Sequence, residues 1–178
     1  NGMPILPITE TINHTLQYHV GVANIGELTG DPFDVDAFRD VNRFLYMGEF
    51  DDSDTIPYTD AFSDHLREIA LDVFGPHMVE DRFPFAKAVY DDLETASVFR
   101  MYEGAGHSPG PAMGDLVEFH ERSLAGDDIE AIRADLGGNV PQLGPHIEYG
   151  PQNPAVGEQI TFDGHRSAVV DADVVGFE

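Results

Sequence analysis

The sequence has no cysteine and, among its 178 residues, a single lysine, Lys87. Without cysteine, neither disulfide bonds nor thiolate metal sites can form, and thiols say nothing about the redox compartment. Only 9 Lys and Arg residues stand against 33 Asp and Glu residues, which gives a formal net charge of −24. Nucleic acid is therefore not an expected partner, because binding to a phosphate backbone needs a basic face that so few cations cannot form.

Long apolar runs are also missing. No run approaches the about 20 residues needed to span a bilayer, and the amino terminus has no signal-peptide pattern, so no membrane span is predicted. The acidic composition resembles the surfaces of proteins from extreme halophiles. In brine the Debye length falls to about 3 Å, which screens the repulsion between carboxylates. We therefore expect an acidic, halophilic protein that is less stable at low salt.

Strand and helix patterns alternate through the middle of the chain. A buried apolar strand is predicted at residues 41–47, ending at Gly48, and a second strand at residues 98–102. Apolar residues recur with the helical period of 3.6 in four segments, 58–74, 84–93, 111–124 and 127–136. One helical turn is predicted at 34–40, and residues 1–32 are expected to be irregular.

The pattern changes after residue 137. Gly, Pro and Asn suggest a linker, and beyond it apolar residues alternate with period 2, as in β-strands. The predicted fold class is α/β, with a partial doubly wound parallel sheet and a small β-sandwich-like carboxyl-terminal piece. The expected domain organisation is an α/β unit at 1–125, a short helix and linker at 126–145, and the start of a β module at 146–178.

Two polar loops follow the two predicted strands. Asp51 lies just after the first strand, and His107 follows the second strand in the glycine-rich turn EGAGH. Neighbouring parallel strands place their carboxyl ends at the same edge, where ligands of open α/β sheets bind. A carboxylate there can fix the tautomer of a histidine and leave its other ring nitrogen free to take a proton.

These loops resemble the carboxyl-terminal half of an α/β-hydrolase. FLYMGEFD at residues 44–51, with Ile56-Pro57 after it, resembles the family's penultimate strand, and MYEGAGH at residues 101–107 is similar to its last strand and histidine loop. The order of acid before histidine also matches. The resemblance covers about residues 1–125 and implies that Asp51 is the acid of a catalytic triad and His107 its base. The loop is acidic throughout and the gap to the histidine is long, so Asp52 and Asp54 are alternative acids.

The nucleophile is not expected within the chain. GHSPG at residues 106–110 formally matches the G-x-S-x-G elbow, but Pro109 lacks the N–H that the oxyanion hole needs, and the acid precedes Ser108 instead of following it. The chain alone is therefore predicted to be inactive. Its expected partner is the missing amino-terminal half of the hydrolase, on the same polypeptide or on a separate chain, upstream of Asn1.

The tail carries a second resemblance. Residues 147–178, with PAVGEQITFD at 154–163 and VVGFE at the end, resemble the first strands of a polycystic-kidney-disease-type immunoglobulin-like domain. Such modules imply an extracellular or cell-surface protein. The predicted function is part of a serine hydrolase of the esterase, lipase or peptidase type, acting on an ester or amide. The alternative is a non-catalytic extracellular surface, adhesion or assembly protein that keeps the hydrolase scaffold.

Simpler roles compete for the same residues. Asp51 could cap the following helix instead of orienting a histidine. The acidic cluster at residues 51–54 lacks the glycine and distal glutamate of an EF-hand calcium loop. We therefore expect no metal and no cofactor.

Overall fold

The computed structural model of the chain describes residues 5–54, 56, 63–142, 148–151 and 154–163. It is a mixed α/β structure with a parallel sheet of two strands. Strand β1 (Arg43–Gly48) pairs with β2 (Ser97–Tyr102) from Arg43 opposite Ser97 to Gly48 opposite Tyr102. Both predicted strands are thus present and are direct neighbours. Only Met47 and Gly48 of β1 are buried; the rest of the strand is half-buried, although the apolar run predicted burial on both faces.

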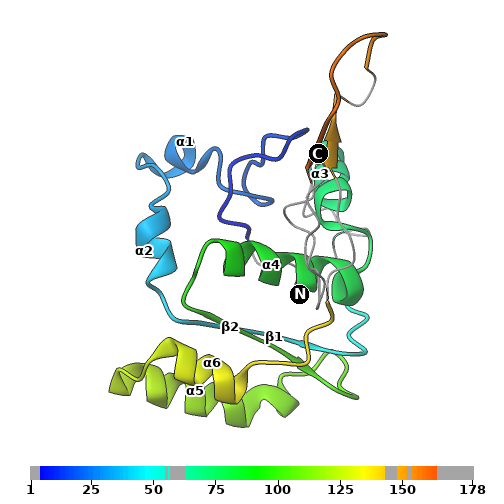
Figure 1. The fold of residues 1–178 in the computed structure, drawn as a ribbon. Helices are drawn as coiled ribbons and strands as arrows, with labels where there is room; N and C mark the ends of the chain where they lie inside the picture. The colour runs from blue at the N-terminus through cyan, green and yellow to red at the C-terminus, as the bar shows by residue number, and fades with distance from the viewer. Residues whose placement is uncertain (1–4, 55, 57–62, 143–147, 152–153, 164–178) are drawn as a thin grey trace, which may run out of the picture.

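Helices cover both faces of this sheet (Figure 1). Helix α4 (Phe83–Asp92) lies on one face, and α5 (Met113–Ala125) and α6 (Ile129–Leu136) lie on the other. The remaining helical segments are α1 (Ile25–Thr29), α2 (Val35–Arg39), α3 (Asp64–Phe74), a π-helical turn (Met78–Arg82) and a 3₁₀ turn (Gly110–Ala112). The helical turn predicted at 34–40 is confirmed, whereas α1 lies in a stretch that was expected to be irregular.

Local sequence explains where these helices begin and end. The side chains of Asp34, Ser63 and Asp128 each accept one backbone N–H in the first turn of α2, α3 and α6, respectively. Helix α3 ends at Gly75, whose φ of 88° is a conformation that favours glycine. Helix α4 begins one residue before the predicted start and continues directly from the π-helical turn. Of the helix predicted at 58–74, α3 covers the part from Asp64 onward, and residues 58–62 lie outside the described residues.

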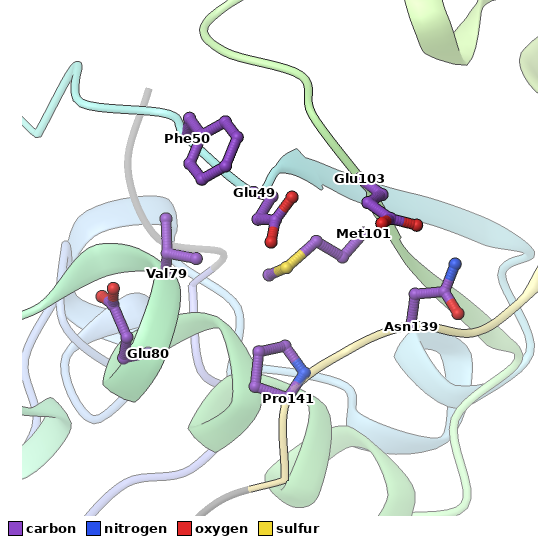
Figure 2. A pocket seen from close by; sticks show the side chains of 8 residues that line it. All are labelled: Glu49, Phe50, Val79, Glu80, Met101, Glu103, Asn139 and Pro141. Atoms are coloured by element: carbon purple, nitrogen blue, oxygen red, sulfur yellow. The ribbon is translucent and has the colours of Figure 1, made fainter.

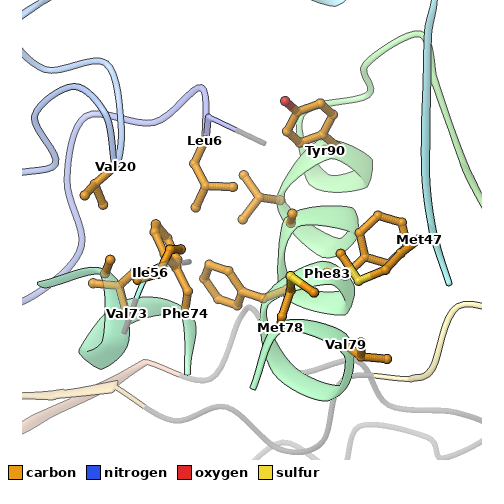
Figure 3. Packing of buried hydrophobic residues seen from close by; sticks show 14 of the residues in the cluster. Leu6, Val20, Met47, Ile56, Val73, Phe74, Met78, Val79, Phe83 and Tyr90 are labelled. Atoms are coloured by element: carbon orange, nitrogen blue, oxygen red, sulfur yellow. The ribbon is translucent and has the colours of Figure 1, made fainter. Parts of the chain in front are cut away.

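The larger core lies between the sheet, α3 and α4 (Figure 3). Phe83, Phe85, Val89 and Tyr90 of α4 pack against the sheet residues Met47, Phe99 and Met101, together with Leu6, Leu16 and Val20 from the amino-terminal segment. A smaller cluster on the opposite face joins Val98 of β2 to Phe119 of α5 and to Ile132 and Leu136 of α6. The alternation of side chains along each strand thus divides the apolar residues between two helical layers.

The segment after α6 returns to the sheet. Gly138 forms a parallel bridge with Arg100, donating its N–H to the carbonyl of Phe99 (2.9 Å) and accepting the N–H of Met101 (3.0 Å). This glycine therefore extends the sheet beyond β2 by one bridge, inside the region where the sequence suggests a linker. Further on, β3 (Glu148–Gly150) and β4 (Thr161–Asp163) form a separate antiparallel pair. The predicted strand residues beyond 163 lie outside the described residues.

Candidate active site

The acid loop and the histidine loop meet at the carboxyl edge of the parallel sheet. Both carboxylate oxygens of Asp51 lie 3.1 Å from Nδ1 of His107, although 56 positions separate the two residues in sequence. The Asp51 side chain is 12% exposed and that of His107 is 46% exposed. The largely shielded carboxylate of Asp51 therefore faces an imidazole that is nearly half exposed to solvent.

Only one tautomer of the neutral imidazole satisfies this contact. An ionised carboxylate accepts hydrogen bonds and cannot donate them, so Nδ1 of His107 carries the proton that points at Asp51. Nε2 then has a lone pair. Within the described part of the chain no hydrogen bond is formed at Nε2, which is the nitrogen that a general base uses.

Two further hydrogen bonds hold Asp51 in place. Its Oδ1 accepts the backbone N–H of Ser53 (3.0 Å), and its own backbone N–H donates to the carbonyl of Gly48 (3.2 Å) at the end of β1. The acid thus sits in a tight turn directly after the strand and caps that turn, while still reaching across to His107. Asp51 does not cap the helix that follows it: the cap of α3 is Ser63.

The two alternative acids are arranged differently. Asp52 is exposed, and the described contacts of His107 do not include it. Asp54 forms an ion pair with the fully buried Arg82 and also accepts the N–H of Ile56 (3.2 Å). Of the three carboxylates, Asp51 is the one that the structure brings to the histidine.

The serine next to the histidine, Ser108, forms a local hydrogen bond with the backbone. Oγ of Ser108 accepts the N–H of Gly110 (3.2 Å), at the entrance to the 3₁₀ turn before α5. Across the described residues, His107 makes no hydrogen bond to any serine. The site therefore contains an acid and a base but, in this part of the chain, no nucleophile in contact with them.

A groove of about 540 Å³ lies beside this edge (Figure 2). It begins at Glu49 and Phe50, the residues between β1 and Asp51, and sequence reasoning did not identify it. Its lining combines apolar side chains with three carboxylates: Glu49, Phe50, Val79, Glu80, Met101, Glu103, Asn139 and Pro141. A second groove, of about 660 Å³, shares Glu49 and Phe50 and reaches Asp51 itself. The acid of the pair therefore lines a groove whose walls are both acidic and apolar.

Neither a metal centre nor a membrane span is found in what the structure describes. No three His, Asp or Glu side chains among the described residues gather as a metal site requires. None of the helices in the described ranges combines the length and apolarity of a bilayer-crossing segment. Comparison of the chain with protein-family models, with curated proteins and with solved structures gave no match.

Proposed function

We propose that this chain supplies the acid and the histidine of a serine-type hydrolase acting on an ester or amide. The observation that carries the proposal is the contact between Asp51 and His107 at the carboxyl edge of two parallel strands. A carboxylate in this position orients the imidazole and stabilises the imidazolium that forms when the ring takes a proton. An ordinary surface ion pair would not need to place the free nitrogen of the ring at the ligand-binding edge of a sheet.

The chemistry would run in two halves. Nε2 of His107 takes the proton of a serine hydroxyl, whose oxygen attacks the carbonyl carbon of the substrate. The imidazolium then returns that proton to the departing alcohol or amine, which leaves an acyl-enzyme. Water, activated by the same nitrogen, hydrolyses the acyl group and restores the serine. Asp51 remains ionised throughout, and the serine and oxyanion hole come from outside these residues.

Two features of the described residues support a further segment of chain that completes the domain. Strand β1 has one described neighbour, β2, so its other edge is open in the described part of the chain. On α5, Met113, Val117 and Leu124 are 51%, 53% and 90% exposed. Open strand edges and exposed apolar side chains are usually covered in a stable domain. We propose that the amino-terminal half of a doubly wound α/β-hydrolase sheet covers them.

The test compares this chain with a polypeptide extended by the preceding coding sequence. Both are assayed in high salt with short-chain aryl esters and with peptides. The extended protein is expected to turn over, and His107→Ala is expected to lower kcat by about 10⁴-fold or more. His65→Ala, at an exposed histidine on α3, is the matched control and should leave kcat unchanged. Equal activity of the extended protein and its His107→Ala variant would contradict the proposal.

The same assay addresses the alternative of a non-catalytic surface or assembly protein. An extended protein without turnover, and without an elbow serine upstream, would favour that alternative. The extracellular location rests on the resemblance of residues 147–178, most of which lie outside the described residues, and stays a prediction.

A further inference from the structure

A second side chain links the acid loop to the histidine loop. Oε2 of Glu49, the residue after β1, accepts the backbone N–H of Gly104 at 2.8 Å. Gly104 has a φ of 69° and forms the turn from which the chain runs to His107. We infer that Glu49 is a positioning residue, whose carboxylate holds this turn so that the imidazole meets Asp51. This inference rests on the proposed function, since it assigns Glu49 a role in the same site.

The surrounding backbone shows how closely the two loops are joined. The N–H of Glu49 donates to the carbonyl of Tyr102 (3.0 Å), and the N–H of Phe50 donates to the carbonyl of Ala105 (2.8 Å). These two bonds continue the strand pairing past the ends of β1 and β2. They use backbone groups that any residue provides. The bond from Gly104 differs because it depends on the side chain at position 49, so the sequence itself controls it.

Because Gly104 is exposed, the role of Glu49 in positioning the turn can be distinguished from a role in stabilising the whole fold. Gly104 is exposed, so water can replace the carboxylate when Glu49 is shortened, and no buried donor is left without a partner. The cost to the whole fold is therefore small. The turn, however, loses the one side-chain hydrogen bond that the described residues make to Gly104. Three residues later, the ring of His107 then loses part of its preferred orientation.

The readout is the tautomer of His107, which needs neither substrate nor serine. The full chain is labelled with ¹⁵N-histidine, and long-range ¹H–¹⁵N correlations at alkaline pH and high salt report which ring nitrogen is protonated; the signal is assigned with His107→Gln. In the unaltered chain the Nδ1–H form should predominate. Glu49→Ala should lower the Nδ1–H population at least two-fold. Glu49→Gln retains an acceptor oxygen and should stay close to the unaltered chain.

Three further variants make the result decisive. Glu103→Ala removes a neighbouring exposed glutamate that does not bond to Gly104, and it should have no effect. Glu49→Asp keeps the charge but is one methylene too short, so it should behave as Glu49→Ala and replaces that variant if it does not fold. Asp51→Asn is measured in parallel and should remove the preference for Nδ1–H.

The outcomes distinguish the two proposals. If Asp51→Asn changes the tautomer while Glu49→Ala and Glu49→Asp do not, the role of Glu49 is overturned and the acid–histidine pair stands. If Glu49→Gln loses as much as Glu49→Ala, the hydrogen bond is not what acts, and the inference is also overturned. If Asp51→Asn itself has no effect, the proposed pair fails.

Discussion

The guanidinium of Arg82 is fully buried and forms an ion pair with Asp54, at the far end of the acid loop from Asp51. The same guanidinium donates to the carbonyls of Gly75 (3.1 Å) and Pro76 (2.9 Å), where α3 ends. The buried Arg82 therefore links the acid loop to the turn that follows α3 through an ion pair and hydrogen bonds. This explains why Asp54, which the sequence alone could not separate from Asp51, is unavailable to the histidine.

Removing Asp54 should therefore destabilise the fold strongly. Asp54→Ala leaves the charge of Arg82 buried without its partner, which costs about 3–5 kcal/mol. Asp52→Ala, next to it but exposed, should change the free energy of unfolding by no more than about 0.5 kcal/mol. Urea unfolding in high salt measures both variants. Similar midpoints for the two would show that the buried pair does not anchor the loop.

Gly48 permits the close contact between the two loops. A Cβ atom at this position would lie 2.4 Å from the carbonyl oxygen of Gly106 and 2.5 Å from that of Ala105. Gly48→Ala should therefore push the histidine loop away, with a loss of about 1–3 kcal/mol in stability and of the Asp51–His107 contact. The control is Gly106→Ala, whose Cβ would meet its nearest atom at 3.6 Å. Comparable unfolding midpoints and equal His107 NMR signals in both variants would contradict this account.

The two strands and most helices were predictable because they depend on local pattern. The apolar run of β1, the glycine at 75 and the cap at Asp128 each act within a few residues. Which apolar residues of a helix face the core is not local. On α5, Phe119 is buried while Leu124 is 90% exposed, because the sheet beneath offers contacts to only one side of the helix.

The site shows the same division between local and tertiary information. The meeting of Asp51 and His107 follows from parallel pairing, which the alternation of strands and helices predicts. The choice between Asp51 and Asp54 does not follow from it, because Asp54 is held by Arg82, a residue 28 positions away. The π-helical turn that carries Arg82 has no simple sequence signature.

The stability of the protein should increase with salt. With a net charge of −24, repulsion between carboxylates opposes folding until it is screened. Since the Debye length is already near 10 Å at 0.1 M, most of the rise in Tm should occur below about 0.5 M KCl and then level off. Thermal unfolding monitored by circular dichroism between 0.02 and about 3 M KCl measures this. A Tm that is independent of salt would contradict a halophilic character.

At high pH the buried phenol of Tyr90 should limit stability. Burial raises the pKa of Tyr90 to about 12, above the usual value of about 10, and its hydroxyl donates to the carbonyl of Ile5 (3.0 Å). Between these values the unfolded chain loses this proton and the folded chain keeps it, so stability is complete below pH 10 and falls as pH rises toward 12. The loss reaches about 3 kcal/mol.

Tyr90→Phe isolates this effect. The variant lacks the hydroxyl, so its free energy of unfolding should depend less on pH across the same window, even if it is less stable at pH 9. Urea unfolding at several pH values compares the two slopes. Parallel slopes would mean that Tyr90 does not keep its proton in the folded state.

The central claim is that Asp51 holds His107 with its proton on Nδ1 and its lone pair on Nε2. The most direct measurement is the long-range ¹H–¹⁵N spectrum of the His107 ring at alkaline pH, in the unaltered chain and in Asp51→Asn, whose amide can donate to Nδ1. We predict a protonated Nδ1 in the unaltered chain and a shift to protonated Nε2 in the variant. A predominantly protonated Nε2 in the unaltered chain, or identical spectra for the two proteins, would contradict the account.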